Sequence, residues 1–366
     1  MKTISKGTGL WIGPSFKSKG GVASVIETYF TMDYFARANI HFLASMEDGN
    51  KWGKFRLFFL SLMFFLRHIR SWRMVHVHMS SQASFWRKSV FIVLAALFRI
   101  PVIIHLHSSS FPGFYFGSGI FSKAFIRYVF RKASKILVLS APMMELVTEF
   151  GLMERSCIFP NPVITKPVGQ AKRKENTLLF IGRITREKGI FELVRAIGLV
   201  RKSIPGVMVW VAGTGQEDLM RAEVRQLGLE DHFQFLGWIS GEEKTELLGE
   251  ATVMVSPSYG EGQSISILES MMAGLPVICT SVGGNEFLLG NPPAGVIVPA
   301  REVDPLADAI VGLLENESAR TELAKLGKNR IEQGFNYFIV ENELNKIYNS
   351  LPNHQNKKLV KIYGEL

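Results

Sequence analysis

The chain has 366 residues, 47% of them hydrophobic and 20% charged, and a formal net charge of +10 at pH 7. This composition excludes a disordered chain, because disordered sequences combine low hydrophobicity with a high density of charge. The two cysteines, Cys157 and Cys279, are far apart, so neither a disulfide framework nor a zinc-binding CxxC pair is predicted. The length is typical of a protein with two domains.

The beginning of the chain has no apolar run after its lysines, so no signal peptide is predicted. The longest apolar stretch, residues 57–66, has about half of the roughly 20 residues that a membrane-spanning helix needs. A cytoplasmic protein without a transmembrane helix is therefore expected.

Positive charge and phenylalanine are concentrated in the first half of the chain. Residues 1–170 contain 21 Lys and Arg against 7 Asp and Glu, and they hold 20 of the 27 phenylalanines. A basic and aromatic surface is typical of proteins that meet anionic lipid head groups. Two alternatives stay open, a nucleic-acid partner and a simple division into core phenylalanines and solubilising cations.

Short apolar runs alternate with longer amphipathic segments along most of the chain, which is the pattern of doubly wound α/β sheets. The predicted strands are residues 9–12, 74–78, 102–107, 135–139, 177–181, 207–212, 233–236, 252–256 and 276–279. A Pro-rich and charged segment, residues 160–175, separates the first four strands from the others and is predicted to be a linker. We expect two Rossmann-like domains, residues 1–165 and 166–345, and a tail, residues 346–366, that packs back on the first domain.

A candidate phosphate site follows the first strand of the second domain. Gly182 allows the backbone to turn, Arg183 and Lys188 lie in one loop, and a helix is predicted to begin near Gly189. Two cations beside a helix N-terminus at the carboxyl end of a strand form a phosphate site. The alternative is a solvated turn. A later glycine pair, Gly213 and Gly215, lacks the third glycine of a dinucleotide-binding motif and is interpreted as a structural turn.

The most specific segment is residues 256–276. Glu261 stands in a glycine-flanked loop, Ser264 is the predicted N-cap of the next helix, and that helix carries Glu269. In a helix the two glutamates would be roughly 12 Å apart. Glycosidase carboxylate pairs are roughly 5–9.5 Å apart, so these two residues should have different roles.

These motifs resemble the retaining family 4 glycosyltransferases, whose GT-B fold has two Rossmann-like domains facing across a cleft. The resemblance rests on Glu261 and Glu269 with the following Gly283-Gly284, and on the loop that carries Arg183. In the first half, Gly20-Gly21 and the His-bearing ends of two strands are also similar to the family pattern. The similarity extends over roughly residues 8–345. One departure is Gln263-Ser264, where Phe-Gly is commoner, and it affects the expected sugar more than the expected reaction.

The resemblance implies a role for each matching residue. Arg183 and Lys188 would neutralise the leaving diphosphate in place of a metal ion, Glu261 would bind donor-sugar hydroxyls, and His107 would support charge near the anomeric carbon. Other donor-binding residues implied are Gly20, Gly21 and Gly182, Trp238 and Ile239 beside the base, Gln263, Ser264 and Ile265 at the sugar or phosphate, and Glu269 on the ribose. His76, His78 and His105 are expected to be structural. No Asp-x-Asp motif occurs, which agrees with a donor site that uses no metal ion. The resemblance further implies a UDP-sugar as the donor and no cofactor.

The first domain should supply the acceptor site. Lys123, Arg127, Arg131 and Lys135 are four residues apart and would form one stripe on a helix, where an anionic surface would relieve their mutual repulsion. Residues 54–73 form a second candidate, apolar in the centre and basic at both ends, with a buried helix as the alternative.

We therefore expect an enzyme on the inner face of the cell membrane that uses a lipid-linked acceptor in bacterial surface-polysaccharide synthesis, of lipopolysaccharide or capsule, with no nucleic-acid partner. The alternatives are a sugar-nucleotide epimerase of the same fold and a non-catalytic membrane- or nucleic-acid-binding protein.

Overall fold

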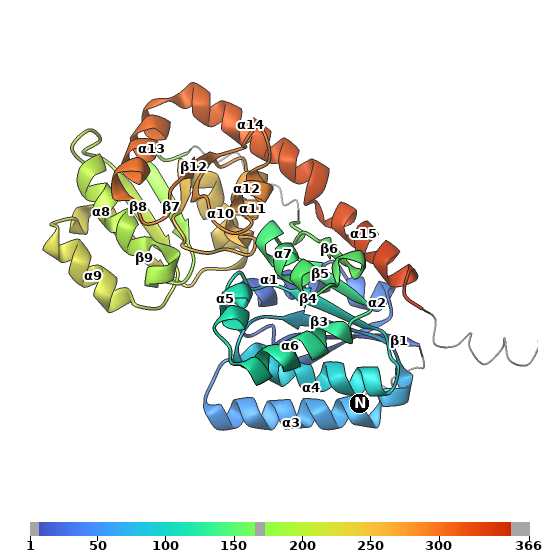
Figure 1. Ribbon diagram of the computed structural model, residues 1–366. Coiled ribbons are helices and arrows are strands. Elements are labelled where there is room, and N and C mark those ends of the chain that lie inside the picture. The colour runs from blue at the N-terminus through green and yellow to red at the C-terminus, as the bar shows by residue number, and fades with distance from the viewer. Residues whose placement is uncertain (1–6, 165–172, 353–366) are drawn as a thin grey trace, which may run out of the picture. The chain divides into compact units, whose positions relative to one another are not determined.

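The computed structural model describes residues 7–164 and 173–352 and divides into two compact units. The first unit comprises Met1–Asn161 and Val340–Leu366, and the second comprises Pro162–Ile339 (Figure 1). This boundary lies four residues before the predicted one. Part of the predicted linker, residues 165–172, lies outside the described residues.

The described part of the first unit contains a six-stranded parallel sheet in the order β2-β1-β3-β4-β5-β6. Its strands are β1 (Thr8–Pro14), β2 (Ile40–Met46), β3 (Trp72–Met79), β4 (Val102–Leu106), β5 (Lys135–Val138) and β6 (Ser156–Ile158). The four strands predicted from the sequence are the four central ones. The two edge strands were not predicted, because both are only partly buried and lack a continuous apolar run.

Helices cover both faces of this sheet. They are α1 (Gly21–Thr31), α2 (Tyr34–Arg37), α3 (Lys51–Arg67), α4 (Ala83–Leu97), α5 (Phe111–Phe116), α6 (Ile120–Arg131), α7 (Ala141–Glu149) and α15 (Tyr337–Asn349), with the 3₁₀ turns η1 (Ile69–Ser71) and η2 (Met153–Arg155). Figure 1 shows α3, α4 and α6 on one side, where Phe65, Phe91 and Phe130 pack into the main core. On the other side, Trp11 of β1 contacts the rings of Tyr29 and Tyr34, which belong to α1 and α2.

The C-terminal helix α15 completes the first unit. The Trp11 indole donates a hydrogen bond to the Tyr348 hydroxyl at 2.7 Å, and the Tyr34 hydroxyl donates to Asn345 at 2.8 Å. Arg37 forms an ion pair with Glu341 at 2.7 Å. Residues 340–345, which the sequence analysis placed in the second domain, therefore belong to the first unit. The predicted tail lies in α15 as far as Asn349, and its residues 353–366 are outside the described residues.

The second unit also has, among its described residues, a six-stranded parallel sheet, in the order β12-β11-β10-β7-β8-β9. Its strands are β7 (Thr177–Ile181), β8 (Met208–Ala212), β9 (Phe233–Gly237), β10 (Val253–Ser256), β11 (Val277–Thr280) and β12 (Val296–Val298). Leu178 and Phe180 of β7 pack into one core cluster and Leu179 packs into another, because successive strand residues point to opposite faces. A sheet buried on both faces has nearly continuous apolar strands, which explains why five of the six were predicted.

The helices of the second unit are α8 (Ile190–Val200), α9 (Glu217–Gln226), α10 (Gly241–Glu250), α11 (Ile265–Met272), α12 (Asn285–Leu289), α13 (Val303–Glu315) and α14 (Glu317–Gly334), with the 3₁₀ turns η3 (Arg186–Lys188) and η4 (Glu230–His232). Helices α8 and α13 contact each other and cover one core cluster, whereas α11 and α14 contact each other over the second. Within the described ranges, no helix of either unit combines the length and the apolarity needed to cross a membrane.

Candidate active site

The predicted donor-site residues lie at the point where the strand order of the second sheet reverses. β7 is flanked by β8, the next strand in the chain, and by β10, which comes later. In open α/β sheets, ligands bind at such a switch point, beyond the carboxyl ends of the strands. The loop after β7 carries Arg183 and Lys188, and the loop after β10 carries Glu261. Two neighbouring loops at this edge therefore bring the predicted cations and carboxylate into one region.

Lys188 and Glu261 are in direct contact in this region. The Lys188 ammonium lies 2.5 Å from a carboxylate oxygen of Glu261, and the hydroxyl of Ser258 donates to the same oxygen at 2.8 Å. Glu261 is buried, whereas Lys188 is half-buried. The ammonium and the hydroxyl give this buried carboxylate the polar partners that it needs away from water.

Glycines in the loops after β11 and β8 allow these loops to pack closely against the two loops of the site. At Gly283, φ is +58°, and a Cβ would stand 1.7 Å from the carbonyl oxygen of Glu261. At Gly213, a Cβ would stand 1.7 Å from the carbonyl oxygen of Gly182. Any larger residue would displace the backbone that carries Glu261 or Arg183. The glycine at 213 thus supports the neighbouring loop, in agreement with its interpretation as a structural turn.

Arg183 directly follows Gly182, and its side chain is exposed at the carboxyl end of β7. Lys188 is the last residue of η3, and α8 begins two residues later, at Ile190. The predicted helix start near Gly189 is therefore confirmed.

Ser264 is the N-cap of α11, as predicted, and its hydroxyl accepts a hydrogen bond from the backbone N–H of Ile267 at 3.5 Å. Gln263 and Ser264 are buried, and Ile265 is the first residue of the helix. The loop that carries Glu261 therefore leads directly into a helix N-terminus, where backbone N–H groups favour anionic ligands.

Glu269 belongs to a second ion pair. The ammonium of Lys244, on α10, lies 2.5 Å from its carboxylate. Trp238, in the loop after β9, is 41% exposed, whereas Ile239 is buried in the apolar core. Of these two predicted residues, Trp238 is therefore the accessible one.

Two further residues, Ser258 and Lys244, contact the predicted carboxylates and were not predicted from the sequence. Ser258 lies three residues before Glu261 in the same loop. Its short distance along the sequence could have identified its hydroxyl as a candidate partner of that carboxylate. Nothing in the sequence indicates that Lys244, on a different helix, pairs with Glu269.

In the first unit, the predicted residues Gly20, Gly21 and His107 also follow the carboxyl ends of strands. Gly20 and Gly21 begin α1 after β1, and β1 lies beside β3 at the reversal point of that sheet. His107 directly follows β4, and its Nε2 lies 3.0 Å from Nδ1 of His78. Burial, followed by the neighbouring His105, holds the pKa of His107 well below its usual value, so the ring is neutral at pH 7.

The predicted basic stripe is wrong at one position. Lys123, Arg127 and Arg131 lie on α6, but this helix ends at Arg131, and Lys135 is the first residue of β5. The chain must leave the helix there because Lys135 pairs with Ile103 in the sheet. Arg127 also has a carboxylate partner within the unit, Glu149, at 3.3 Å.

The second predicted segment, residues 54–73, is also divided between elements. Helix α3 ends at Arg67, and Trp72 is buried in β3, where its indole donates to the carbonyl of Phe65. The alternative of a buried helix is wrong, because of its seventeen residues only Ser61 and Phe65 are buried. Six large apolar side chains of α3 are exposed, namely Trp52, Phe55, Phe59, Leu60, Met63 and Leu66.

Family models match most of the chain. Residues 164–330 match the model described as "Glycosyl transferases group 1", and residues 49–162 match the "Glycosyl transferase 4-like domain". The chain belongs to the GT4 family of glycosyltransferases. The first match along the chain ends at residue 162 and the second begins at residue 164, close to the boundary between the structural units after Asn161. The 4-like model therefore matches the first unit, and the group 1 model matches the second.

Relatives with assigned activities support the same family. The glycosyltransferase is 28% identical over 294 residues to a glycogen synthase of Mycobacterium tuberculosis, which covers 76% of this chain and 69% of that protein. It is 29% identical over 181 residues to a phosphatidyl-myo-inositol mannosyltransferase of Mycobacterium leprae, covering 49% of this chain and 48% of the relative.

The fold is that of known GT-B structures. The crystal structure of Anabaena HepE in complex with UDP and glucose superposes with a TM-score of 0.73 at 16% identity, over 94% of this chain and 100% of that one. This glycosyltransferase therefore has the expected α/β architecture of two Rossmann-like domains, and it uses a nucleotide-sugar donor.

Proposed function

We propose that this glycosyltransferase moves a sugar from a nucleotide-diphosphate sugar to a lipid-linked saccharide, with retention of configuration at the anomeric carbon. The observation that carries the proposal is the contact between Lys188 and Glu261 at the switch point of the second sheet. In the donor, the β-phosphate is bonded directly to the sugar. A cation for the phosphate and a carboxylate for the sugar hydroxyls should therefore lie side by side.

The residues suit the charge that the reaction develops. The bond between the anomeric carbon and the β-phosphate oxygen breaks, and the acceptor hydroxyl oxygen bonds to that carbon while its proton passes to the departing diphosphate. Negative charge grows on the diphosphate as this happens. Arg183 and Lys188 would neutralise that charge, and fixed cations placed where charge develops are an effective form of catalysis.

The nucleotide is expected to be UDP, and no metal ion is expected to take part in the transfer. The HepE structure contains UDP and glucose, which makes UDP-glucose the first donor to test here. Glu269 would bind the ribose hydroxyls, a common task of an acidic residue in such folds.

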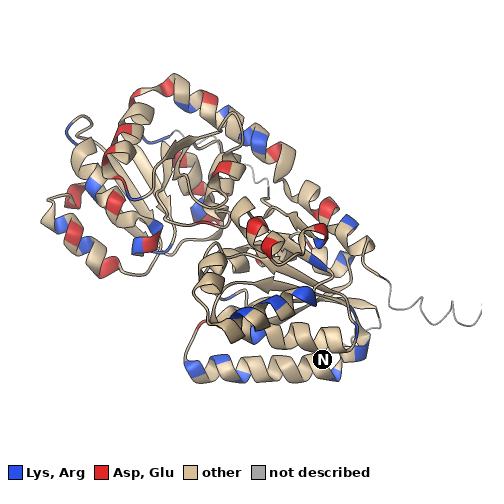
Figure 2. Cartoon of the chain, viewed as in Figure 1, with Lys and Arg blue, Asp and Glu red and all other residues tan. Residues whose placement is uncertain are grey.

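A lipid-linked acceptor agrees with the surface of the first unit. Figure 2 shows Lys and Arg along α3 and α6 of this unit, whereas the helices of the second unit carry both signs of charge. Apolar side chains are exposed on the same two helices, among them Trp52 and Phe121 at 81% and 88%. Exposed apolar rings beside cations are typical of surfaces that bind anionic membranes.

We therefore place the enzyme on the inner face of the cell membrane, as a peripheral protein in the synthesis of lipopolysaccharide or capsule. Two relatives support these acceptor classes. The phosphatidyl-myo-inositol mannosyltransferase supports a lipid acceptor, and the glycogen synthase supports a saccharide acceptor.

The deciding experiment incubates the protein with radiolabelled nucleotide sugars and extracted bacterial lipid. Label that moves into the lipid fraction with wild type and not with Lys188→Ala would support the proposal. The matched control is Lys202→Ala, an exposed lysine of the same unit. Conversion of UDP-sugar without any acceptor would indicate the epimerase instead. Binding to lipid with neither reaction would indicate a non-catalytic protein.

A further inference from the structure

Four histidines gather on one face of the first sheet, and three of them, His76, His78 and His105, have no role in the proposed reaction. His76 and His78 are two residues apart on β3 and therefore lie on the same face. His105 of β4 is paired in register with His78, and His107 follows directly after β4. The ring centroids of His76 and His105 are 5.4 Å apart, and those of His78 and His105 are 5.3 Å apart. Residues 75, 77, 104 and 106 point to the opposite face, into the main core.

The cluster is buried, and its hydrogen bonding is incomplete. His76, His78 and His105 are each at most 2% exposed. Nε2 of His76 lies 3.3 Å from Nδ1 of His105, and Nδ1 of His78 lies 3.0 Å from Nε2 of His107. The Nε2 atoms of His78 and His105 have no hydrogen-bond partner among the described residues. Buried polar atoms are rarely left without a partner, so each such atom calls for a ligand or another explanation.

One ring nitrogen from each of His76, His78 and His105 lies within 4.8 Å of the others. Two nitrogens bound to one tetrahedral Zn²⁺ at 2.0–2.1 Å are about 3.4 Å apart. Small rotations of the three rings would therefore bring all three nitrogens to bonding distance. Three imidazoles also form a known zinc ligand set that leaves a fourth position for water.

We propose that His76, His78 and His105 bind a divalent transition-metal ion, with Zn²⁺ the best fit, in the first unit. Imidazole nitrogen suits Zn²⁺, Ni²⁺ and Cu²⁺, whereas Mg²⁺ and Ca²⁺ prefer oxygen ligands. The site is therefore distinct from any Mg²⁺ that a diphosphate could carry, and it does not depend on the proposed reaction.

One contact beside the cluster suits a metal site. Nδ1 of His76 lies 2.6 Å from the hydroxyl of Tyr348, which is held in turn by the indole of Trp11. Such a contact fixes the ring orientation and the tautomer of a metal-binding histidine.

The position of Tyr348 gives the metal a structural consequence. Tyr348 lies on α15, close to the end of the described chain, whereas the histidines lie on the central strands. An ion bound by His76 would therefore strengthen the attachment of α15 to the sheet of the first unit.

The test uses the full-length protein without a polyhistidine tag, stripped with a chelator and then titrated with ZnCl₂. We expect one equivalent to bind, to raise the melting temperature by several degrees, and to be replaceable by Co²⁺ with the visible absorption bands of a tetrahedral site. MgCl₂ should give no such shift. Wild type that binds neither Zn²⁺ nor Co²⁺, or an equal shift with Mg²⁺, would overturn the proposal.

Variants identify the ligands. His78→Gln and His105→Gln keep a polar side chain and should weaken Zn²⁺ binding about a hundredfold. Tyr348→Phe should weaken it about tenfold, as loss of a group that orients a ligand does. The matched control is His232→Gln in η4 of the second unit, which should bind Zn²⁺ like wild type. Folding of each variant is checked by circular dichroism, and undiminished binding by a folded His105→Gln would reject the assignment.

Discussion

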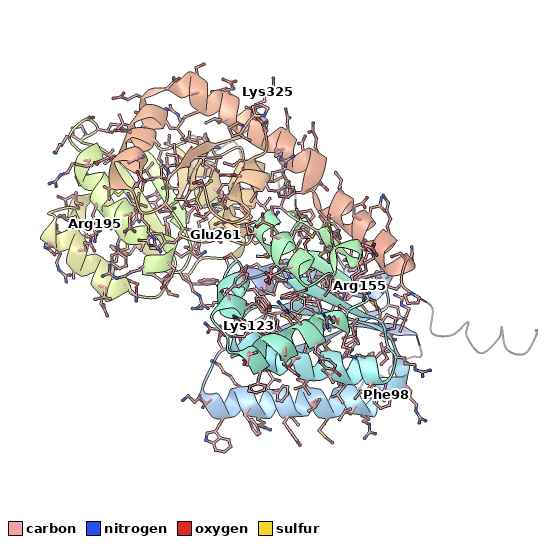
Figure 3. The ribbon with its side chains drawn as sticks, in the orientation of Figure 1. Phe98, Lys123, Arg155, Arg195, Glu261 and Lys325 are labelled. Carbon is pink, nitrogen blue, oxygen red and sulfur yellow. The ribbon has the colours of Figure 1, made fainter. Side chains whose placement is uncertain are left out.

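Lys188 forms an ion pair with Glu261, and the proposed reaction also needs its charge for a phosphate. Glu261 does not depend on Lys188 alone, because Ser258 donates to the same carboxylate oxygen at 2.8 Å. When a diphosphate binds, Lys188 can thus share its ammonium protons with the phosphate while Glu261 stays hydrogen-bonded. Figure 3 labels Glu261 among the side chains of the second unit.

The first prediction concerns the two cations of this loop. Arg183→Ala and Lys188→Ala should each lower kcat about a hundredfold, which corresponds to a loss of about 3 kcal/mol of transition-state stabilisation. The reason is that the departing diphosphate would lack one of its two fixed positive charges. The measurement is steady-state transfer of labelled sugar, with circular dichroism to confirm that each variant is folded. Near-normal rates in both variants would reject the diphosphate assignment, and Lys202→Ala should match wild type.

The second prediction concerns Glu269. If this carboxylate binds the ribose in the ground state and the transition state alike, Glu269→Gln should raise KM for the donor about tenfold and leave kcat nearly unchanged. Loss of a hydrogen bond to a charged group costs about 1.5–3 kcal/mol, and the lower end of this range corresponds to about tenfold. Glu246→Gln, an exposed substitution on α10, is the matched control. A fall in kcat without a change in KM would instead place Glu269 near the reacting atoms.

At the scale of residues, the sequence could predict which side chains share an edge but not all of their partners. Lys188 and Glu261 were predictable together, because both follow buried strands, and adjacent parallel strands end at one edge of a sheet. The ion pair between Lys244 and Glu269 was not predictable, since it depends on how α10 packs beside α11. The histidine cluster was assigned a structural role because the register of β3 against β4, which brings three rings together, is absent from the sequence.

Helix α3 presents the clearest unpartnered surface among the elements. Trp52, Phe55, Phe59 and Met63 follow one another at intervals of three or four residues, which places them on one face of the helix. Lys51 and Arg67 are the two ends of this helix. An apolar stripe with basic ends suits a helix that lies in the plane of a membrane surface.

The third prediction separates this stripe from the basic face of α6. Phe55→Ser, Phe59→Ser and Met63→Ser combined should abolish sedimentation with phosphatidylglycerol vesicles at high salt, because each apolar side chain contributes about 1.5–3 kcal/mol on burial. Reversing Lys123, Arg127 and Arg131 to Glu should reduce binding about a hundredfold at low salt only, since each cation contributes about 1 kcal/mol and salt screens it. Both variants are measured by vesicle co-sedimentation over a series of salt concentrations.

Neutral vesicles and a distant substitution serve as controls for this experiment. Leu219→Ser, an exposed apolar residue on α9 of the second unit, should leave sedimentation unchanged. Equal sedimentation of wild type and both variants would show that neither helix touches the membrane. Figure 3 labels Lys123 on α6 and Phe98 directly after α4. Sedimentation of Phe98→Ser with the vesicles tests whether the end of α4 also contacts the membrane.

The elements that the sequence predicted best are those buried on both faces. Strands β7 and β3 were found because their apolar runs are nearly continuous, whereas β2 and β6 lack such a run and the run of β12 is only three residues long. The stripe on α6 was extended one turn too far. Spacing of four residues fits a helix beyond Arg131 as well as within it, and only the pairing of β5 with β4 shows where the helix ends.

For the molecule as a whole, charge and motifs divide along the same boundary as the two units. The first 170 residues carry 14 more basic than acidic side chains, whereas the rest carry 4 more acidic than basic ones and contain most of the predicted donor-site residues. Substitutions on α3 or α6 should therefore leave nucleotide binding intact, and substitutions at Lys188 should leave vesicle binding intact.

The last prediction tests the donor site on the intact protein without an assay of transfer. UDP at about one hundred times its dissociation constant should stabilise the fold by about 2.7 kcal/mol, seen as a rise in melting temperature, because it binds only the folded state. The rise should be the same in EDTA as in buffer with Mg²⁺, since Arg183 and Lys188 are proposed to replace the metal. Each arm is compared with protein in the same buffer without nucleotide, so that any effect of losing Zn²⁺ from the histidines cancels within the arm. Lys188→Ala should abolish most of the rise while Lys202→Ala retains it. A rise that requires Mg²⁺ would contradict the metal-free donor site, and a larger rise with ADP or GDP than with UDP would change the expected nucleotide.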